Sequence, residues 1–282
     1  MPLTKPQTEV IENKSRFRVL ITGRRFGKTF LAINELAKFA SQSNKKVWYV
    51  APTYRQAKQI CWNELKERLV DHRWVKNINN SDLTITLKNN SRITLRGADN
   101  EQSLRGVGLD FIVLDEFADI HKEAWYEVLR PTLSDTGGHA LFCGSPRGFG
   151  NWSYELFKQG ETNKDWSSFK YTTLEGGQVA DDEIEQARQD LDIRTFQQEY
   201  EATFVNYSGM IYYNFNRQKN IIDKYSKDSA VLHIGLDFNV DPMSAVVCII
   251  LQETIMVVDE IQIYSSNTQE MCEEIRNRYQ NK

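Results

Sequence analysis

The sequence has few cysteines, no long apolar run and no clear excess of either charge. Its four cysteines among 282 residues are far apart, without a C-x-x-C pair or histidines at metal-binding spacing: Cys61, Cys143, Cys248 and Cys272. This pattern argues against a disulfide framework and a zinc site, and it predicts reduced thiols. No apolar run approaches the ~18 residues needed to cross a bilayer, and the first residues lack the apolar core of a signal peptide. We therefore expect a soluble, cytoplasmic protein with no membrane partner.

The charge balance leaves nucleic-acid binding open. Lys and Arg total 35 against 38 Asp and Glu, which gives a net charge of −3. Contact with a polyanion would therefore depend on local basic patches, because the field of the whole chain does not attract one. Apolar residues make up 40% of the chain and aromatic residues 11%, which is ample for buried cores in one large domain or two ordinary ones.

A glycine-containing turn with a Lys-Thr pair follows the first apolar run. Residues 18–21 read R-V-L-I, residues 22–29 read T-G-R-R-F-G-K-T, and residues 30–40 have the pattern of a helix. Strand, turn and helix in this order predict a phosphate-binding loop, because backbone N–H groups and a helix N-terminus concentrate positive charge there. Lys28 would reach the β- and γ-phosphates, and the Thr29 hydroxyl would bind Mg²⁺.

The loop departs from the full G-x-x-x-x-G-K-[ST] pattern at its first position. Thr22 stands there, and the glycine follows one place later, at Gly23. Gly27 keeps the position at which the backbone must come close to a phosphate. The alternative is a basic strand-to-helix turn that binds nothing, and a later acidic motif weakens that alternative.

The acidic motif is an apolar run that ends in two carboxylates. Residues 111–114 read F-I-V-L and are followed by Asp115 and Glu116. On a strand of a parallel sheet, Asp115 would hold Mg²⁺ through water, and Glu116 would orient and deprotonate an attacking water. An Asp-Glu pair can also be a solvated turn, but together with Lys28 and Thr29 it favours a nucleotide hydrolase.

Three more residues are candidates from their type and position. The amide of Gln7, just before the first strand, complements the edge of adenine, although a solvated surface glutamine is the alternative. Arg105 lies in a Gly-rich polar loop and could act as an arginine finger. Ser145 follows the apolar run 140–143 and could sense the γ-phosphate, with a plain Gly-Pro turn as the alternative.

Alternating strand-like and helix-like segments predict an α/β fold. The apolar run 46–50 is followed by helical spacing over 54–70, which implies a parallel sheet with helices on both faces. Segments 83–87 and 92–96 alternate around a turn and predict an antiparallel hairpin appended to that sheet.

The motifs resemble, in their order, those of the large terminase subunit of tailed bacteriophages. The resemblance rests on residues 5–7, 23–29, 49–53, 104–106, 112–116 and 144–146. It implies a P-loop NTPase of the ASCE type, an ATP-driven motor that packs double-stranded DNA into a procapsid, with a nuclease domain on the same chain. The implied cofactors are ATP and Mg²⁺. The implied partners are the portal protein, the small terminase subunit and further copies of the chain in a ring, expected to be a pentamer, in the host cytoplasm and transiently at the portal.

The resemblance also implies roles for individual residues. Gln7 would read adenine, and Glu116 would be the catalytic carboxylate. Arg24 would be a cis contact to phosphate, and Arg105 would be offered in trans to the neighbouring subunit of the ring.

The last part of the chain reads as a second, smaller sheet. Residues 231–237, 245–251 and 255–263 are strand-like, and residues 268–279 have the pattern of an amphipathic helix. Three strands with an acid on the first resemble the start of an RNase H-like nuclease, in which several carboxylates hold two Mg²⁺ ions. Asp237 is the best candidate metal ligand.

The sequence predicts two domains. A helical pattern over 181–204, with aromatic residues on one face, stops near residue 206, so we expect an ATPase domain over 1–207 and a partial RNase H-like nuclease domain over 208–282. Asp259 and Glu260 on the third strand could contribute to the metal site, but the pair reads rather as structural or as support for a metal ligand. Because the other nuclease acids are expected beyond Lys282, the nuclease half is expected to be incomplete.

Two other functions compete with the packaging motor. A helicase or remodelling ATPase shares these loops but normally has a second motor domain. A non-catalytic DNA-binding assembly factor would keep the fold without turnover, and the presence of Lys28, Asp115 and Glu116 argues against it.

Overall fold

The structure is a computed structural model that describes residues 2–71, 73–205, 220–222, 231–239, 241–251 and 254–280. The chain divides into two compact units, Met1–Ile211 and Tyr212–Lys282. The expected domain boundary between residues 207 and 208 lies outside the described residues.

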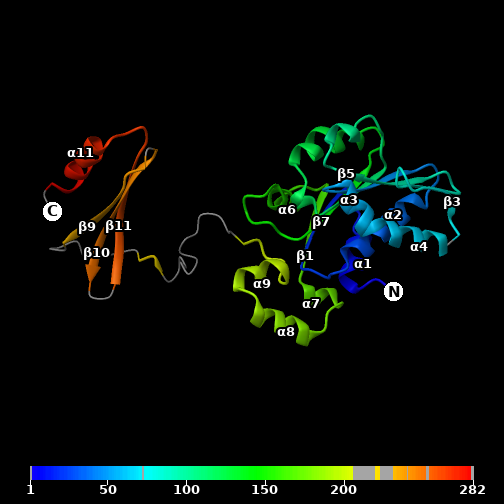
Figure 1. The fold of residues 1–282 in the computed structure, drawn as a ribbon, viewed down its shortest axis with the longest axis horizontal. Coiled ribbons are helices and arrows are strands. Elements are labelled where there is room, and N and C mark those ends of the chain that lie inside the picture. The colour runs from blue at the N-terminus through cyan, green and yellow to red at the C-terminus, as the bar shows by residue number, and fades with distance from the viewer. Residues whose placement is uncertain are drawn as a thin grey trace. The chain divides into compact units, whose positions relative to one another are not determined.

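The first unit is built on a mainly parallel eight-stranded sheet in the order β3-β4-β5-β2-β6-β7-β1-β8 (Figure 1). The strands are β1 (Phe17–Thr22), β2 (Lys46–Ala51), β3 (Val75–Asn79), β4 (Thr84–Leu87), β5 (Arg92–Gly97), β6 (Phe111–Asp115), β7 (His139–Gly144) and β8 (Trp166–Tyr171). The six strands from β5 to β8 in this order run parallel, and β3 and β4 are antiparallel at one edge. The parallel strands therefore all deliver their carboxyl ends to the same edge of the sheet.

Helices connect the strands and cover both faces of the sheet. The α-helices are α1 (Lys5–Glu12), α2 (Lys28–Ala40), α3 (Tyr54–Ala57), α4 (Asn63–Asp71), α5 (Arg130–Thr132), α6 (Trp152–Thr162), α7 (Thr173–Gly176), α8 (Asp181–Asp190) and α9 (Ile193–Glu199). The described part of the unit also contains two π-helical segments, η1 (Lys58–Trp62) and η4 (Ala124–Leu129), and two 3₁₀ turns, η2 (Glu101–Leu104) and η3 (Phe117–Asp119). No helix in the described ranges combines the length and the apolar character needed to cross a membrane.

The two faces of the sheet have separate hydrophobic cores. Along β1, Leu20 packs in the core that includes α2 and α4, while Val19 and Ile21 pack in the core that includes η4 and α6. Successive side chains of a strand point to opposite faces, so a strand buried on both sides is mainly apolar, and a polar residue there, such as Arg18 of β1, needs a buried partner. This confirms the α/β sheet with helices on both faces that the sequence predicts.

The structure corrects two predicted elements. The segment 181–204 is not one helix, because α8 ends at Asp190 and the Asp192 carboxylate accepts hydrogen bonds from the N–H groups of Arg194 and Thr195, at 3.0 and 3.1 Å, to start α9. An N-cap of this kind begins a new helix in place of continuing the old one. The hairpin of β4 and β5 is also part of a larger antiparallel edge, because β3 pairs with β4.

The second unit is a three-stranded antiparallel sheet in the order β11-β10-β9 with one helix. Its elements are β9 (Leu232–Asp237), β10 (Met243–Leu251), β11 (Thr254–Ile263) and α11 (Thr268–Tyr279). Alternate residues of β10, among them Met243 and Ala245, pack with Ile261 and with Met271 of α11 in a small core. The strands and the helix form within two residues of the predicted ranges.

A buried ion pair joins the first strand to the helix that follows it. Arg18 on β1 binds Glu35 on α2, with side chains 2% and 0% exposed. Arg18 Nη1 also donates to the carbonyl of Val10 at 2.7 Å, which ties the end of α1 to the same pair. Burying two charges costs desolvation energy that is offset only while both partners are present.

Removing one member of this pair should destabilise the first unit more than removing both. Among the described residues, Arg18→Met leaves the buried Glu35 carboxylate with Lys38 as its ion-pair partner, at 3.3 Å, so we expect a loss of about 3–5 kcal/mol in the free energy of unfolding. Urea unfolding followed by tryptophan fluorescence measures it. The double variant R18M/E35L should lose less, and Lys158→Met, at an exposed pair, should have little effect. Equal losses in the single and double variants would contradict the argument.

Candidate functional site

The predicted phosphate loop forms the turn between β1 and α2. Arg25 and Gly27 both have left-handed backbone conformations, with φ of 60° and 90°, and α2 begins at Lys28. A side chain at Gly27 would be strained by this φ, and its Cβ would lie 2.6 Å from Gln7 Nε2. The sequence therefore places glycine where both the backbone angle and the available space require it.

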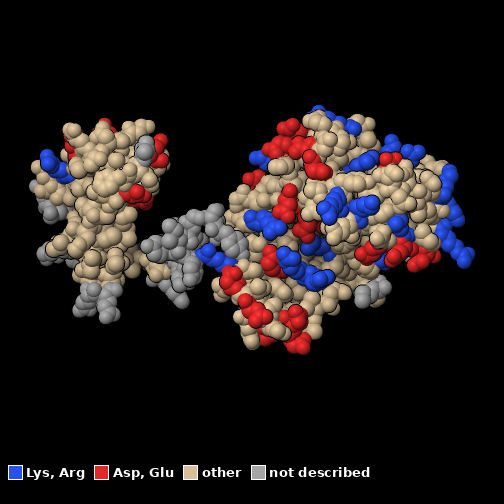
Figure 2. Space-filling model, in the orientation of Figure 1, with Lys and Arg blue, Asp and Glu red and all other residues tan. Residues whose placement is uncertain are grey.

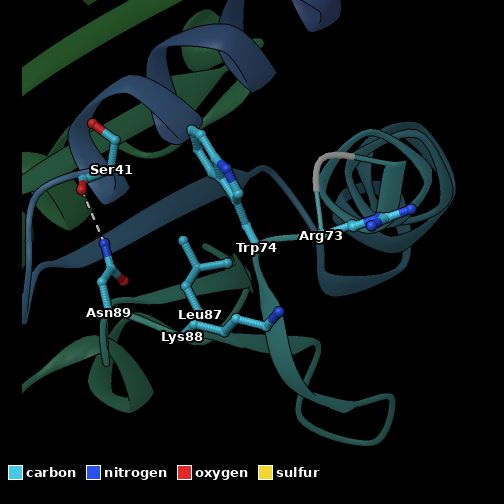
Figure 3. Close-up of a pocket in the computed structure, with 6 residues that line it drawn as sticks. All are labelled: Ser41, Arg73, Trp74, Leu87, Lys88 and Asn89. Carbon is cyan, nitrogen blue, oxygen red and sulfur yellow. Dashed lines mark hydrogen bonds between the residues drawn. The ribbon is translucent and has the colours of Figure 1, made fainter.

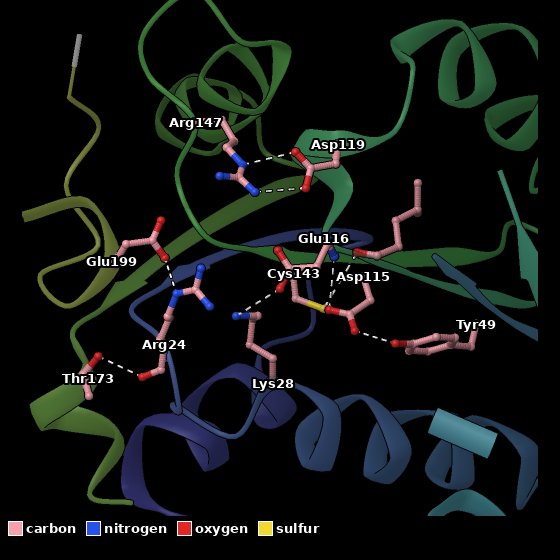
Figure 4. Close-up of polar contacts among 11 residues, drawn as sticks. Arg24, Lys28, Tyr49, Asp115, Glu116, Asp119, Cys143, Arg147, Thr173 and Glu199 are labelled. Carbon is pink, nitrogen blue, oxygen red and sulfur yellow. Dashed lines mark hydrogen bonds and ion pairs between the residues drawn. The ribbon is translucent and has the colours of Figure 1, made fainter. Parts of the chain in front are cut away.

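The structure brings Lys28 and Glu116 together at the carboxyl edge of the sheet. Lys28 Nζ lies 3.4 Å from Glu116 Oε1, with side chains 12% and 34% exposed (Figure 4). Glu116 follows β6 directly and has a left-handed backbone conformation, with φ of 49°. The cation of the loop and the second acid of the acidic motif thus converge on one place.

Asp115 is a buried carboxylate that accepts hydrogen bonds from the two strands flanking β6 and from the residue that follows it. Its Oδ2 accepts from the Tyr49 hydroxyl on β2, and its Oδ1 accepts from Cys143 Sγ on β7 at 3.3 Å and from the Glu116 N–H at 3.1 Å. Burial and the charge of Asp115 raise the pKa of Tyr49 and of Cys143 well above their ordinary values. Both side chains therefore stay protonated and donate to the carboxylate, which fixes its orientation.

The residues at this edge have the donor chemistry for one Mg²⁺ ion together with phosphate. Mg²⁺ at such sites takes one or two protein ligands and completes its shell with phosphate oxygens and water. Thr29, half-buried in the first turn of α2, offers a hydroxyl. Asp115 accepts three hydrogen bonds, so about one of its roughly four lone-pair sites is left for a ligand.

Arg24 is directed to α9. Its Nε donates to Glu199 Oε2, its N–H donates to the Glu199 carbonyl at 2.7 Å, and its own carbonyl accepts from Thr173 Oγ1 at 2.8 Å (Figure 4). The Arg24 side chain is 65% exposed. Burial works to raise the pKa of Glu199, but hydrogen bonds from Gln198 and Arg24 lower it overall, so Glu199 is a carboxylate at neutral pH. The predicted cis contact is therefore anchored on Glu199 in this structure.

Gln7 braces the phosphate loop. Its Nε2 donates to the carbonyl of Phe26 at 3.1 Å and to that of Gly27 at 3.4 Å, while its Oε1 accepts from the Thr4 N–H at 3.0 Å. The side chain is 1% exposed. Gln7 is thus a buried contact between α1 and the loop, which rules out the solvated surface alternative, while adenine reading stays a prediction.

The other predicted residues differ in their surroundings. Ser145 is 8% exposed, directly after β7, and a Cβ at Gly144 would lie 3.5 Å from the Glu116 Cα. The Arg105 side chain is exposed beyond η2 and makes no hydrogen bond or ion pair within the described parts of the chain. The predicted trans role of Arg105 stays a prediction.

Asp237 ends β9 and accepts a hydrogen bond from Asn239 Nδ2 at 2.9 Å. Among the residues that the structure describes, no group of three or more His, Cys, Asp or Glu side chains is placed to hold a metal ion. Asp259 binds Tyr279 and Arg278 of α11. A two-metal site at Asp237 thus stays a prediction, and the contacts of Asp259 are those of a structural residue.

Sequence reasoning missed four supporting residues, Tyr49, Cys143, Arg147 and Glu199. Tyr49 and Cys143 look like ordinary core residues, and only the pairing of their strands beside β6 brings them to Asp115. Arg147 lies two residues after the predicted sensor Ser145, and this closeness in sequence could have identified it as a candidate. Glu199 is 175 residues from Arg24, and no local pattern could have joined them.

A separate cavity of about 320 Å³ lies where α2 ends and β3 begins (Figure 3). It is lined by Ser41, Arg73, Trp74, Leu87, Lys88 and Asn89. Asn89 Nδ2 donates to the carbonyls of Ala40 and Ser41, at 2.8 and 3.0 Å, and so caps α2. None of these described lining residues is a predicted site residue.

The order of the central strands identifies the type of nucleotide-binding fold. A parallel sheet with an additional strand, β7, between the loop strand β1 and the acidic strand β6 is the P-loop NTPase fold of the ASCE type. A family model described as "Terminase large subunit, T4likevirus-type, N-terminal" matches residues 19–219. The chain therefore belongs to the terminase large-subunit family.

Individual relatives agree with this assignment. The terminase large subunit of Escherichia phage T5 is 31% identical, over 91% of this chain and 63% of its own length. The large terminase ATPase domain of Thermus phage P74-26 is 27% identical with a TM-score of 0.64, over 73% of this chain and 94% of that domain. The large terminase of bacteriophage HK97, 14% identical, has the same fold, with a TM-score of 0.62 over 98% of this chain and 66% of that one.

The contacts of Gln7 lead to a prediction about the loop. Gln7→Ala removes the donor to the Phe26 and Gly27 carbonyls, so binding of inorganic triphosphate, which has no base, should weaken about fivefold, the effect of one net hydrogen bond. Isothermal titration calorimetry measures this. Gln42→Ala, at an exposed side chain, is the matched control. Unchanged triphosphate binding in the Gln7 variant, with weaker binding of ATP alone, would assign Gln7 to the base and not to the loop.

Proposed function

We propose that this chain is the ATP-hydrolysing subunit of a motor that moves double-stranded viral DNA into a procapsid. The observation that carries the proposal is the meeting of Lys28 Nζ and Glu116 Oε1 at 3.4 Å. A cation from a phosphate loop and a carboxylate from a neighbouring strand can act on the same terminal phosphoryl group only if they converge in this way.

The proposed chemistry divides the work among the residues at the sheet edge. The loop N–H groups and Lys28 bind the β- and γ-phosphates. Thr29 and Asp115 hold Mg²⁺, which when bound neutralises charge on the phosphate oxygens. Glu116 orients the attacking water and accepts its proton, the task of a general base.

Four residues complete the proposed nucleotide site. Gln7 reads adenine in addition to bracing the loop, and Arg24 contacts phosphate from the same chain. Ser145 senses the γ-phosphate, because it follows the strand that separates Lys28 from Glu116. Arg105 acts in trans on the nucleotide of a neighbouring subunit in a ring. Its guanidinium suits this role because it is exposed and has no ion-pair partner among the described residues.

The surface charges suggest which part of the first unit faces DNA. Figure 2 shows acidic side chains gathered over α8, whose first turn holds Asp181, Asp182 and Glu183, and Lys and Arg side chains around α3. Arg55 of α3 and Lys58 directly after it are exposed. Phosphates would be repelled by the first region and attracted by the second, so we place the DNA contact near α3.

The proposed assembly includes the portal protein, the small terminase subunit and further copies of this chain in a ring, in the cytoplasm of the infected bacterium. We assign residues 1–207 to the ATPase motor. We assign residues 208–282 to a partial RNase H-like nuclease domain that contributes Asp237 as a metal ligand for cutting concatemeric DNA. Three antiparallel strands followed by a helix support that assignment.

ATP hydrolysis measured with and without double-stranded DNA tests the function. A packaging motor should hydrolyse ATP faster when DNA is present and should move DNA into procapsids without separating its strands. Strand separation without packaging would favour a helicase-like ATPase. Absence of hydrolysis at every protein concentration would favour a non-catalytic assembly factor.

Glu116→Gln should keep nucleotide binding and lose turnover. The amide keeps the size of the side chain but cannot accept the proton of the attacking water, so the rate should fall by at least about 100-fold, the lower end of a general-base contribution. Steady-state hydrolysis and equilibrium binding of ATP measure the two properties. Glu123→Gln, at an exposed glutamate, is the control. Rapid hydrolysis by the Glu116 variant would remove this residue from the mechanism.

A further inference from the structure

The backbone at the proposed general base is strained. Glu116 has φ of 49° and ψ of 43°, a left-handed conformation that residues with a side chain seldom adopt. Such conformations persist only where the surrounding structure holds them in place. The turn that follows Glu116 is therefore the place to look for the residues that hold it.

One segment holds this whole turn. Arg147 Nε and Nη2 donate to Asp119 Oδ1 and Oδ2, each at 3.1 Å (Figure 4). Asn151 Nδ2 donates to the carbonyl of Ala118 at 3.0 Å, and Trp152 Nε1 donates to that of Ile120 at 2.9 Å. The Trp152 ring also packs edge-on against Phe117, with ring centroids 5.4 Å apart. Every residue from 117 to 120 thus has a partner between 147 and 152.

The geometry of the Arg147–Asp119 pair makes it the directional part of this contact. Two parallel N–H···O bonds between a planar guanidinium and a carboxylate fix relative orientation as well as distance. Arg147 lies two residues after Ser145, so the same short loop that follows β7 carries both the proposed γ-phosphate sensor and the partner of the Glu116 turn.

We propose that Arg147, through its bidentate pair with Asp119, is a positioning residue for Glu116. It holds the carboxylate in line with the attacking water and does not itself touch the nucleotide. This inference rests on the proposed ATP hydrolysis and names a residue of that site beyond the loop and the acidic motif.

The competing assignment for Arg147 is a direct phosphate contact. Arginines near a triphosphate often serve that purpose, and the side chain is 41% exposed. The two assignments make different predictions. Loss of a positioning residue lowers the turnover rate alone, because a catalytic group displaced by about 1 Å slows the chemical step without changing substrate binding. A phosphate contact affects the binding of nucleotide as well.

The test compares Arg147→Met with the charge-swapped double variant D119R/R147D in the full chain. We expect Arg147→Met to lower kcat between about 10-fold and 100-fold. KM and the affinity for a non-hydrolysable ATP analogue should stay within twofold, and the double variant should recover part of the rate. Arg188→Met, which breaks an exposed ion pair with Glu201 in another part of the unit, should leave kcat unchanged. Weaker analogue binding in step with the loss of kcat would overturn the proposal in favour of a phosphate contact, and an unchanged kcat would also overturn it.

Hydrogen exchange separates this inference from the proposed function. The N–H groups of Asp119 and Ile120 bond within the turn, to the carbonyls of Glu116 and Phe117 at 2.9 and 3.0 Å. Mass spectrometry of the fragment that contains them should show faster exchange in Arg147→Met and not in Arg188→Met. If the unmodified chain hydrolyses no ATP, the proposed function fails. Faster exchange would then still show that Arg147 holds the turn, whereas unchanged exchange would overturn the inference on its own.

Discussion

The contact between the Lys28 ammonium and the Glu116 carboxylate depends on the parallel sheet. Lys28 begins the helix after β1, and Glu116 follows β6, two strands away, with β7 between them. Both strands end at the same edge because all three run in the same direction. An antiparallel arrangement of either strand would carry one of these side chains to the opposite end of the sheet.

The site is held by side chains of the neighbouring strands and by helices that are far away in the sequence. Asp115 is oriented by Tyr49 and Cys143 of the two flanking strands, both of which keep their protons because burial and the neighbouring carboxylate raise their pKa. The phosphate loop is held by Gln7 on one side and by Thr173 and Glu199 on the other. Each contact uses up a polar group that would otherwise be buried without a partner. The shape of the loop is thus determined by three separate parts of the chain.

Local patterns predicted most of the elements and the main charged residues of the site. The alternation of strand and helix, the Gly-Lys-Thr turn and the acids after an apolar run are all short-range features, and the strands and the turn form where these features lie. The predicted single helix over 181–204 was wrong because periodicity alone did not register the capping carboxylate of Asp192. The edge strand β3 was missed because its residues, V-K-N-I-N, are mostly polar and exposed. An edge strand is hydrogen-bonded on one side only, so its pairing leaves a weak trace in the sequence.

The α/β class, the phosphate loop and the acidic pair could be predicted from residue types at fixed spacing, whereas the role of Arg24 and the trans role of Arg105 came from the resemblance to terminases. The side chains that support these groups became known from the three-dimensional fold. It placed Gln7 under the loop, Arg24 on Glu199, and Arg147 on Asp119. The reason is that a hydrogen bond or an ion pair is decided by distance in space, and β-strand order brings together residues that no sequence window contains. The strained backbone at Glu116 is likewise a property of the folded chain, because nothing in the residues around it distinguishes a left-handed conformation from an ordinary one.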